Sequence, residues 1–169
     1  MRDKVVYDGW LKVHKRGFGE KVYDILVDYD AVASLIINEY GEVLLVKQFR
    51  PSSVRETLEI PAGTMDVPDE SNAECLAREL KEEANLEILP ENLEPIVTYQ
   101  PNLGFSNSKM YVFMARINKK QINYKITDHD VYSVVWMAFD ELERNIGEGK
   151  IQDVKTIIAY LYIKAHGLF

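Results

Sequence analysis

The residues most suited to chemistry are three glutamates, Glu79, Glu82 and Glu83, in a segment whose apolar residues recur at helical spacing. On a helix Glu79 and Glu83 lie one above the other, and Glu82 lies beside them. Like charges at this spacing repel each other, and a divalent cation would relieve that repulsion. Carboxylate oxygens suit Mg²⁺ or Mn²⁺, so the pattern predicts a metal site. A solvated acidic face on a surface helix is the alternative interpretation.

A helix over residues 71–85 is expected to position these acids. Ser71 and Glu74 have the spacing of a capping box, which begins a helix. Asn85 tolerates the left-handed conformation that commonly ends one. One face of the helix is apolar and carries Ala73, Leu76, Ala77, Leu80 and Ala84. This face is expected to pack on the core, which leaves the acids on the opposite side.

The segment before this helix adds backbone groups to the predicted site. Residues 58–61 are expected to form a short extended piece, and Pro61, Ala62 and Gly63 then predict a tight bend. Such a bend can turn backbone carbonyls toward the carboxylates of the helix. Loop, glycine and acidic helix together predict a site for a metal ion and a phosphate group.

Length and charge limit the class of protein. The chain has 169 residues, 47% of them apolar, with 27 acidic and 20 basic residues and a net charge of −7. This composition is typical of a folded domain and argues against disorder or a disulfide scaffold. The acidic balance argues against nucleic acid as a partner, because phosphates attract basic surfaces. No apolar run approaches the roughly 18 residues of a membrane helix, so no membrane partner is expected. The single cysteine, Cys75, indicates a reducing, cytoplasmic setting.

The remaining pattern predicts a mixed α/β or α+β fold. Expected strands cover residues 5–13, 21–29, 31–37, 42–49, 93–100, 109–117 and 132–139. Two further helices are expected over residues 140–146 and 151–165. We therefore expect an N-terminal strand extension in residues 1–30 and a main domain in residues 31–169.

The residues around the acidic helix resemble the Nudix box of the Nudix hydrolases. Gly63, Glu70 and the run from Arg78 to Leu86 follow the family pattern of Gly, five residues, Glu, seven residues and Arg-Glu-apolar-x-Glu-Glu-x-Gly-apolar. Two positions depart from it: six residues separate Gly63 from Glu70, and Asn85 replaces the usual glycine. The resemblance implies a Nudix α/β/α sandwich with mixed sheets and an antiparallel N-terminal strand extension.

Segments outside the box resemble the ADP-ribose pyrophosphatases within that family. These are Lys-Gln-Phe-Arg-Pro at 47–51, Leu-Glu-Ile-Pro-Ala-Gly at 58–63, and Pro101, which lies 15 residues after Leu86. The N-terminal strands with Trp10 resemble an extra sheet that this subfamily exchanges between the subunits of a homodimer. The implied activity is metal-dependent hydrolysis of ADP-ribose to AMP and ribose 5-phosphate.

The resemblance also implies which residues bind the metal. The implied ligands are Glu79, Glu82, Glu83 and the carbonyl of Ala62, and the implied ion is Mg²⁺ or Mn²⁺. Such ions would neutralise a pyrophosphate and activate water, so Glu79 and Glu82 also count among the catalytic residues. Arg78 either binds a phosphate or holds the acids of the box in place, and both interpretations stay open.

Five other residues are implied in substrate binding. Arg50 can pair with a phosphate through its planar fork of donors. Glu59 contacts the metal or a ribose hydroxyl, or is a surface acid at a strand end. Trp10 and Tyr23 correspond to positions that stack on adenine, with burial in a strand as the alternative for each. Gly104 belongs to a loop that closes over the substrate.

The catalytic base is sought in a loop, because members of the family often supply a glutamate from a loop that closes over the substrate. The loop over residues 104–108 has no acid, whereas a later loop holds Asp128 and Asp130. Asp130 matches best and Asp128 is the alternate, with a simple turn as the other interpretation of both. Glu79 and Glu82 are the next candidates.

Two other functions stay open. The same chemistry on another nucleoside diphosphate sugar would use the same box, because contacts to sugar and base lie largely in loops. A non-catalytic Nudix-like nucleotide sensor would go with a broken box, whereas the box acids are intact here.

Overall fold

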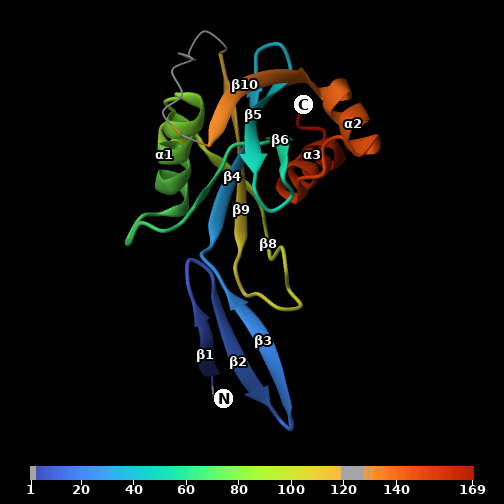
Figure 1. Ribbon diagram of the computed structural model, residues 1–169. Coiled ribbons are helices and arrows are strands. Elements are labelled where there is room, and N and C mark those ends of the chain that lie inside the picture. The colour runs from blue at the N-terminus through green and yellow to red at the C-terminus, as the bar shows by residue number, and fades with distance from the viewer. Residues whose placement is uncertain (1–2, 119–127, 129) are drawn as a thin grey trace.

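The computed structural model describes residues 3–118, 128 and 130–169, and its body is a mixed β-sheet between two layers of helices (Figure 1). The strands are β1 (Asp3–Asp8), β2 (Lys12–Phe18), β3 (Lys21–Val27), β4 (Ala31–Asn38), β5 (Glu42–Arg50), β6 (Arg55–Glu59), β7 (Ala62–Thr64), β8 (Glu94–Tyr99), β9 (Met110–Ile117) and β10 (Val131–Ala138). The helices are α1 (Asn72–Ala84), the short 3-10 helix η1 (Pro90–Asn92), α2 (Phe139–Gly147) and α3 (Val154–His166). The expected α/β/α sandwich with a mixed sheet is confirmed.

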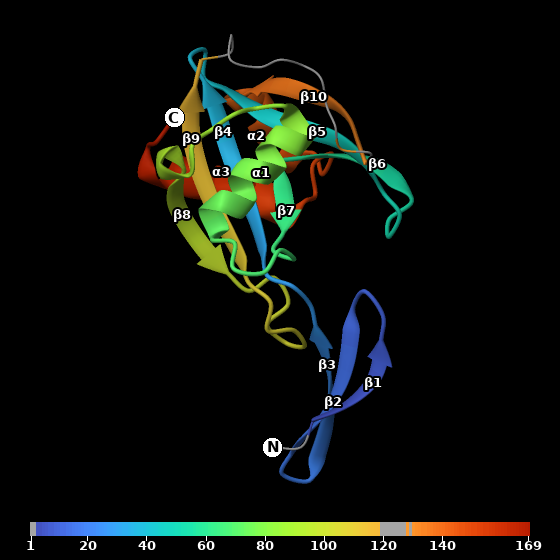
Figure 2. The same ribbon diagram turned by 90° about the vertical axis from the view of Figure 1, so that its left-hand side faces the viewer.

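The main sheet has the order β10-β5-β4-β9-β8. β4 and β9 run parallel, and the other neighbours in this order run antiparallel. β6 pairs with β5 and β7 pairs with β4, so both short strands lie against the centre of the sheet. α1 covers one face, and α2 and α3 cover the other (Figure 2). Among the described residues, no helix is long and apolar enough to cross a membrane.

β4 is a central strand because its apolar run is buried on both sides of the sheet. Val32 and Ile36 belong to the core that packs on α1. Leu35 and Ile37 point to the opposite face and belong to the core that packs on α2 and α3. The alternation of these side chains therefore fixes the sheet between two helical layers.

α1 begins and ends as the sequence predicts. The Ser71 side chain accepts the Glu74 backbone N–H at 3.3 Å, and the Glu74 carboxylate accepts the Ser71 N–H at 2.9 Å. Asn85 takes the left-handed conformation, with φ 49° and ψ 38°. Leu76 and Leu80 are fully buried under the sheet. This orientation directs Glu79 and Glu83 toward β7.

β1, β2 and β3 form a small antiparallel sheet that stands apart from the main body (Figure 1). The single strand expected over residues 5–13 is wrong, because the chain reverses at Gly9–Leu11 and this stretch is the β1–β2 hairpin. Gly9 marks the break within a stretch whose other residues are largely apolar and therefore resemble one strand. The Leu26 backbone N–H donates to the Phe105 carbonyl at 2.7 Å, which ties the small sheet to the loop between β8 and β9.

The bend expected over Pro61, Ala62 and Gly63 is displaced toward the N-terminus, because the chain changes direction between β6 and β7 while Ala62 and Gly63 already belong to β7. Ala62 and Gly63 are paired in register with β4. The Ser34 backbone N–H donates to the Pro61 carbonyl at 3.0 Å. The backbone next to the acidic helix is therefore part of the sheet, which holds it more rigidly than a free loop would.

Candidate functional site

An open cavity of ≈ 410 Å³ lies where the end of β5, β7, the acidic side of α1 and the residues before β10 meet. Its acidic lining residues are Asp66, Glu79, Glu82, Glu83, Asp128 and Asp130. Arg50 and Arg78 supply positive charge to the same lining, and Trp10 supplies an aromatic ring. The other lining residues are Gln48, Ala62, Gly63 and Thr64. The described lining therefore carries an excess of negative charge.

Arg78 holds the acids of the box together. Its Nε and Nη2 each donate to a Glu70 carboxylate oxygen at 3.1 Å. Its Nη1 donates to Glu79 at 2.7 Å and to Glu82 at 3.4 Å. The hydrogen bonds to Glu70 raise the pKa of Arg78 above its ordinary value. This geometry favours the structural interpretation of Arg78 over a contact with phosphate.

Gly63 packs directly against Glu79. A Cβ at position 63 would overlap the Glu79 side chain, so only glycine allows this approach. The stretch from Gly63 to Glu70, one residue longer than the box pattern, contains Asp69 in the left-handed conformation with φ 64°. Glu70 still reaches Arg78, so this loop absorbs the extra residue without separating the pair.

Glu83 is a buried acid, with 5% of its surface exposed. Its Oε2 accepts the Ala62 backbone N–H at 3.0 Å. Burial, together with the charges of Glu79 and Asp128, raises the pKa of Glu83 to about 8, although the Ala62 N–H acts in the opposite direction. Burial also raises the pKa of Glu79. Ionisation of these two acids is therefore disfavoured where no further cation lies beside them.

The carboxylates of the cavity fit a divalent cation by their chemistry. Hard oxygen donors in negative excess are the set that Mg²⁺ or Mn²⁺ prefers. Among the described residues, no three acidic, histidine or cysteine side chains converge closely enough to hold a metal ion as they stand. In this arrangement Arg78 donates to Glu79 and Glu82, and the Ala62 N–H donates to Glu83. The donor set therefore fits such an ion once Glu79 and Glu82 turn away from Arg78.

Asp128 and Asp130 reach the cavity just before β10. The Asp128 backbone N–H donates to the Glu82 carbonyl at 3.1 Å, which docks this segment on the end of α1. The Asp128 carboxylate accepts the backbone N–H groups of Asp130 at 2.6 Å and of Val131 at 3.2 Å. Asp128 is thus engaged in a turn, whereas Asp130 is exposed and lines the cavity.

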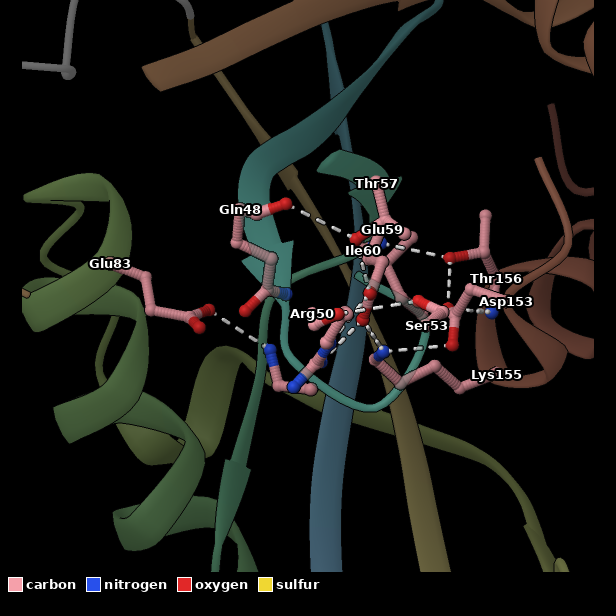
Figure 3. Close-up of polar contacts among 11 residues, drawn as sticks. Gln48, Arg50, Ser53, Thr57, Glu59, Ile60, Glu83, Asp153, Lys155 and Thr156 are labelled. Carbon is pink, nitrogen blue, oxygen red and sulfur yellow. Dashed lines mark hydrogen bonds and ion pairs between the residues drawn. The ribbon is translucent and has the colours of Figure 1, made fainter. Parts of the chain in front are cut away.

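Arg50 lines the cavity with its guanidinium fixed by Glu59 (Figure 3). Its Nε donates to Oε1 of Glu59 at 2.8 Å, and its Nη2 donates to Oε2 at 2.5 Å. The buried Glu59 also accepts the Thr57 hydroxyl at 2.7 Å and the Lys155 ammonium. The structure thus places Glu59 behind Arg50 and outside the cavity lining, and its expected contact with the metal or a ribose hydroxyl stays a prediction.

The structure brings Trp10 to the cavity but not Tyr23 or Gly104. The exposed Trp10 ring lies 5.6 Å from the ring of Tyr29, an aromatic neighbour that the sequence interpretation missed. Tyr23 lies on β3 opposite Arg16 and outside the lining. Gly104 lies in the loop between β8 and β9, also outside the lining.

The sequence interpretation missed two residues near the site, Gln48 and Lys155, for different reasons. Gln48 precedes Arg50 by two positions on β5, so strand alternation could have placed both side chains on one face. Lys155 carries no such signal. It lies 96 residues from Glu59, at the start of a helix whose pattern indicates core packing.

Comparison with families of known proteins gives one match. The NUDIX domain family matches residues 28–159, which run from the end of β3 into α3 and include every lining residue of the cavity except Trp10. The small N-terminal sheet lies outside the match.

Individual relatives have several names. A GDP-mannose pyrophosphatase from Yersinia enterocolitica is 30% identical over 189 aligned residues, covering 99% of this chain and 95% of the relative. An ADP-ribose pyrophosphatase from Bacillus subtilis is 27% identical over 135 residues, covering 79% of this chain and 71% of the relative. A methanol dehydrogenase activator from Bacillus methanolicus has the same identity and coverage as the latter.

Proposed function

The chain belongs to the NUDIX domain family, and from this premise we propose that it hydrolyses the pyrophosphate bond of nucleoside diphosphate sugars, with ADP-ribose as its preferred substrate. The products are AMP and ribose 5-phosphate. The observation that carries the proposal is a single cavity lined by the glutamates of α1, by Arg50 and by Trp10. These are the groups that a divalent cation, a diphosphate and a base require.

We assign Glu79, Glu82, Glu83 and the carbonyl of Ala62 as the groups that hold Mg²⁺, with Mn²⁺ as a substitute. When bound, the ion supplies neutralisation of the diphosphate charge and a more acidic water. Arg78 compensates Glu79 and Glu82 as long as these side chains are turned toward it.

Asp130 is assigned as the general base that takes a proton from the attacking water. It is exposed toward the cavity, while the carboxylate of Asp128 is engaged by two backbone N–H groups. Arg50 binds the diphosphate through its guanidinium, and Trp10 stacks on the base. The diphosphate is thereby held between the positive charge at the end of β5 and the carboxylate side of the cavity.

GDP-mannose is the second candidate substrate. The GDP-mannose pyrophosphatase aligns along 99% of this chain, whereas the ADP-ribose pyrophosphatase aligns along 79%. Both substrates contain the same diphosphate, so the carboxylates and Arg50 would serve either one. Discrimination between them would fall to the aromatic residues Trp10 and Tyr29 and to the contacts with the sugar.

A product assay tests this function. The full chain is incubated with ADP-ribose, GDP-mannose, other nucleotide sugars and oxidised deoxynucleoside triphosphates, with and without Mg²⁺, and the released compounds are identified. We expect AMP and ribose 5-phosphate from ADP-ribose, at the highest kcat/KM of the panel and only with the metal. Faster release of GMP from GDP-mannose would select the second candidate. Absence of any nucleoside monophosphate from nucleotide sugars would contradict both.

We further propose that residues 1–30 are an extension that joins two copies of the chain into a homodimer with exchanged N-terminal strands, beside main domains formed by residues 31–169. In support, β1 is exposed along its whole length. Large apolar side chains of the small sheet are also exposed, among them Val5, Tyr7, Phe18 and Val22. A two-fold partner would cover such a surface. Sedimentation at micromolar concentration should give a dimer, and a monomer would contradict this assembly.

A further inference from the structure

A buried cluster of paired charges joins the start of α3 to the strand behind the cavity (Figure 3). Its members are two cations, Arg50 and Lys155, and two carboxylates, Glu59 and Asp153. The Lys155 ammonium contacts Glu59 and also Asp153, the latter at 2.9 Å. Lys155 and Glu59 are only 6% and 3% exposed. Lysine is almost never so deeply buried unless it is paired, so the burial of Lys155 depends on its carboxylate partners.

The first turn of α3 is fixed to the same strand by a second set of hydrogen bonds. Asp153 is the N-cap of α3 and accepts the Thr156 N–H at 3.0 Å and the Thr156 hydroxyl at 2.5 Å. The Thr156 hydroxyl in turn accepts the Ile60 backbone N–H at 2.9 Å. Because Ile60 follows Glu59 directly, α3 and the Glu59 segment are held as one unit. Lys155 therefore meets Glu59 in a fixed geometry.

Both carboxylate oxygens of Glu59 are fully used. Oε1 accepts Nε of Arg50 and the hydroxyl of Thr57, and Oε2 accepts Nη2 of Arg50 and the ammonium of Lys155. Burial alone would raise the pKa of Glu59. The hydrogen bond from Arg50 and the charge of Lys155 outweigh burial and hold the pKa at about 2. Glu59 is therefore an ionised anchor at neutral pH.

Arg50 is the only member of the cluster that lines the cavity. Its side chain is 42% exposed, whereas that of Glu59 is 4% exposed. Because Nε and Nη2 are bound to Glu59, the plane of the guanidinium is fixed and Nη1 is the nitrogen left for a phosphate oxygen. Loss of the Lys155 charge would leave the buried Glu59 and the partly buried Asp153 with one cation and would loosen this orientation.

We propose that Lys155 is a positioning residue, which neutralises and orients Glu59 so that Glu59 fixes the Arg50 guanidinium for the diphosphate of the substrate. The inference rests on the proposed function, because it assigns a role in binding a nucleoside diphosphate sugar. Lys155 itself does not reach the cavity and touches neither the substrate nor the reacting atoms.

The first test is the kinetics of Lys155→Met, which keeps the length of the side chain and removes its charge. Arg50 contacts the diphosphate in both the ground state and the transition state, so we expect KM for ADP-ribose to rise about 10-fold with kcat within about 3-fold. Lys164→Met is the matched control, since Lys164 lies on the same helix and pairs with Glu143 at the surface. It should leave both constants unchanged.

A double-mutant cycle separates positioning from general support of the fold. Lys155→Met is combined with Arg50→Ala, and kcat/KM is measured for the four proteins. If Lys155 acts through Arg50, Lys155→Met should lower kcat/KM less than about 2-fold once Arg50 is alanine. Equal losses in both backgrounds would contradict the proposal. Circular dichroism verifies the fold, and if Lys155→Met does not fold, Lys155→Gln replaces it with the same expectations.

Failure of the proposed function is distinguishable from failure of this inference. If the wild type released no product from any nucleotide sugar, the function would be wrong. Binding of inorganic pyrophosphate with Mg²⁺, measured by calorimetry on the same four proteins, would then test the positioning role. The positioning role is supported if Lys155→Met weakens pyrophosphate binding in the wild-type background but not in the Arg50→Ala background. Equal weakening in both backgrounds would overturn it.

Discussion

Glu83 and Glu59 are glutamates buried to nearly the same degree, with 5% and 3% of their surface exposed, yet their surroundings act on them in opposite directions. Burial and neighbouring carboxylates raise the pKa of Glu83 to about 8, although the Ala62 N–H and, more weakly, the charge of Lys155 act in the opposite direction. Burial acts on Glu59 as well, but Arg50 and Lys155 outweigh it and hold its pKa at about 2.

The difference between these two acids distinguishes the carboxylates that we expect to bind a cation from those that hold Arg50 in place. On the cavity side, carboxylates outnumber the cations near them, and added positive charge would lower the free energy of the site. In the cluster around Glu59, the two carboxylates balance two cations, Lys155 and Arg50 itself, so no further ion is needed there. An excess of carboxylates over cations therefore indicates the candidate binding site more clearly than the burial of a glutamate does.

The largest effect is expected from the proton acceptor on the cavity side. Asp130→Asn should lower kcat about 10²–10⁴-fold with little change in KM, which is the range for a lost general base. Steady-state kinetics on ADP-ribose measure this, with Asp128→Asn as the comparison. If Asp128→Asn has this effect and Asp130→Asn does not, the assignment is displaced by two residues.

A loss of the same kind is expected from Glu83 itself. Glu83→Gln keeps the size of the side chain and removes its charge, so turnover should fall about 10²-fold or more. Its midpoint of thermal unfolding should not fall, because burial already disfavours ionisation of Glu83 and glutamine is a neutral group of the same size. Glu87→Gln, which changes an exposed acid paired with Lys81, is the control. A folded Glu83→Gln protein with wild-type turnover at limiting Mg²⁺ is incompatible with the assignment.

The opposite outcome is expected behind Arg50. Glu59→Gln leaves Lys155 and Arg50 facing each other without their shared carboxylate, so the free energy of unfolding should fall by about 3 kcal/mol. Urea denaturation of Glu59→Gln and Glu83→Gln compares the two acids directly. Equal stability of both variants would remove the distinction between a balanced and an unbalanced cluster.

The smallest effect is expected at the uncharged edge of the cavity. Trp10→Ala should raise KM for ADP-ribose about 10-fold at nearly unchanged kcat, because stacking on the base is worth about 1–3 kcal/mol and is present throughout the reaction. Tyr23→Ala, on β3 and away from the lining, is the control. An unaltered KM in Trp10→Ala would mean that the base is held elsewhere.

Local signals predicted the acidic side of the cavity well. The capping box at Ser71 and the left-handed Asn85 set the limits of α1, and the apolar spacing set which side carries the glutamates. Glu79, Glu82 and Glu83 therefore needed only helical periodicity to be brought together. The position of Trp10 follows from the resemblance and not from residue spacing, because Trp10 lies in the turn between β1 and β2, where the spacing predicts a continuous strand.

The balanced cluster could not be predicted in the same way. Glu59 and Lys155 are 96 residues apart, and their contact depends on how α3 packs against the strand that ends at Glu59. The spacing of residues around Glu59 and around Lys155 does not indicate that the two side chains pair. The sequence therefore gives no indication that the carboxylate of Glu59 binds Arg50, Thr57 and Lys155.

Mn²⁺ binding tests most directly the claim that the unbalanced carboxylates form a cation site. Calorimetric titration of the wild type and of Glu83→Gln without substrate compares the affinities. We expect one or more Mn²⁺ ions to bind the wild type and the affinity to fall at least about 10-fold in Glu83→Gln. Equal Mn²⁺ affinity in the two proteins would contradict the account.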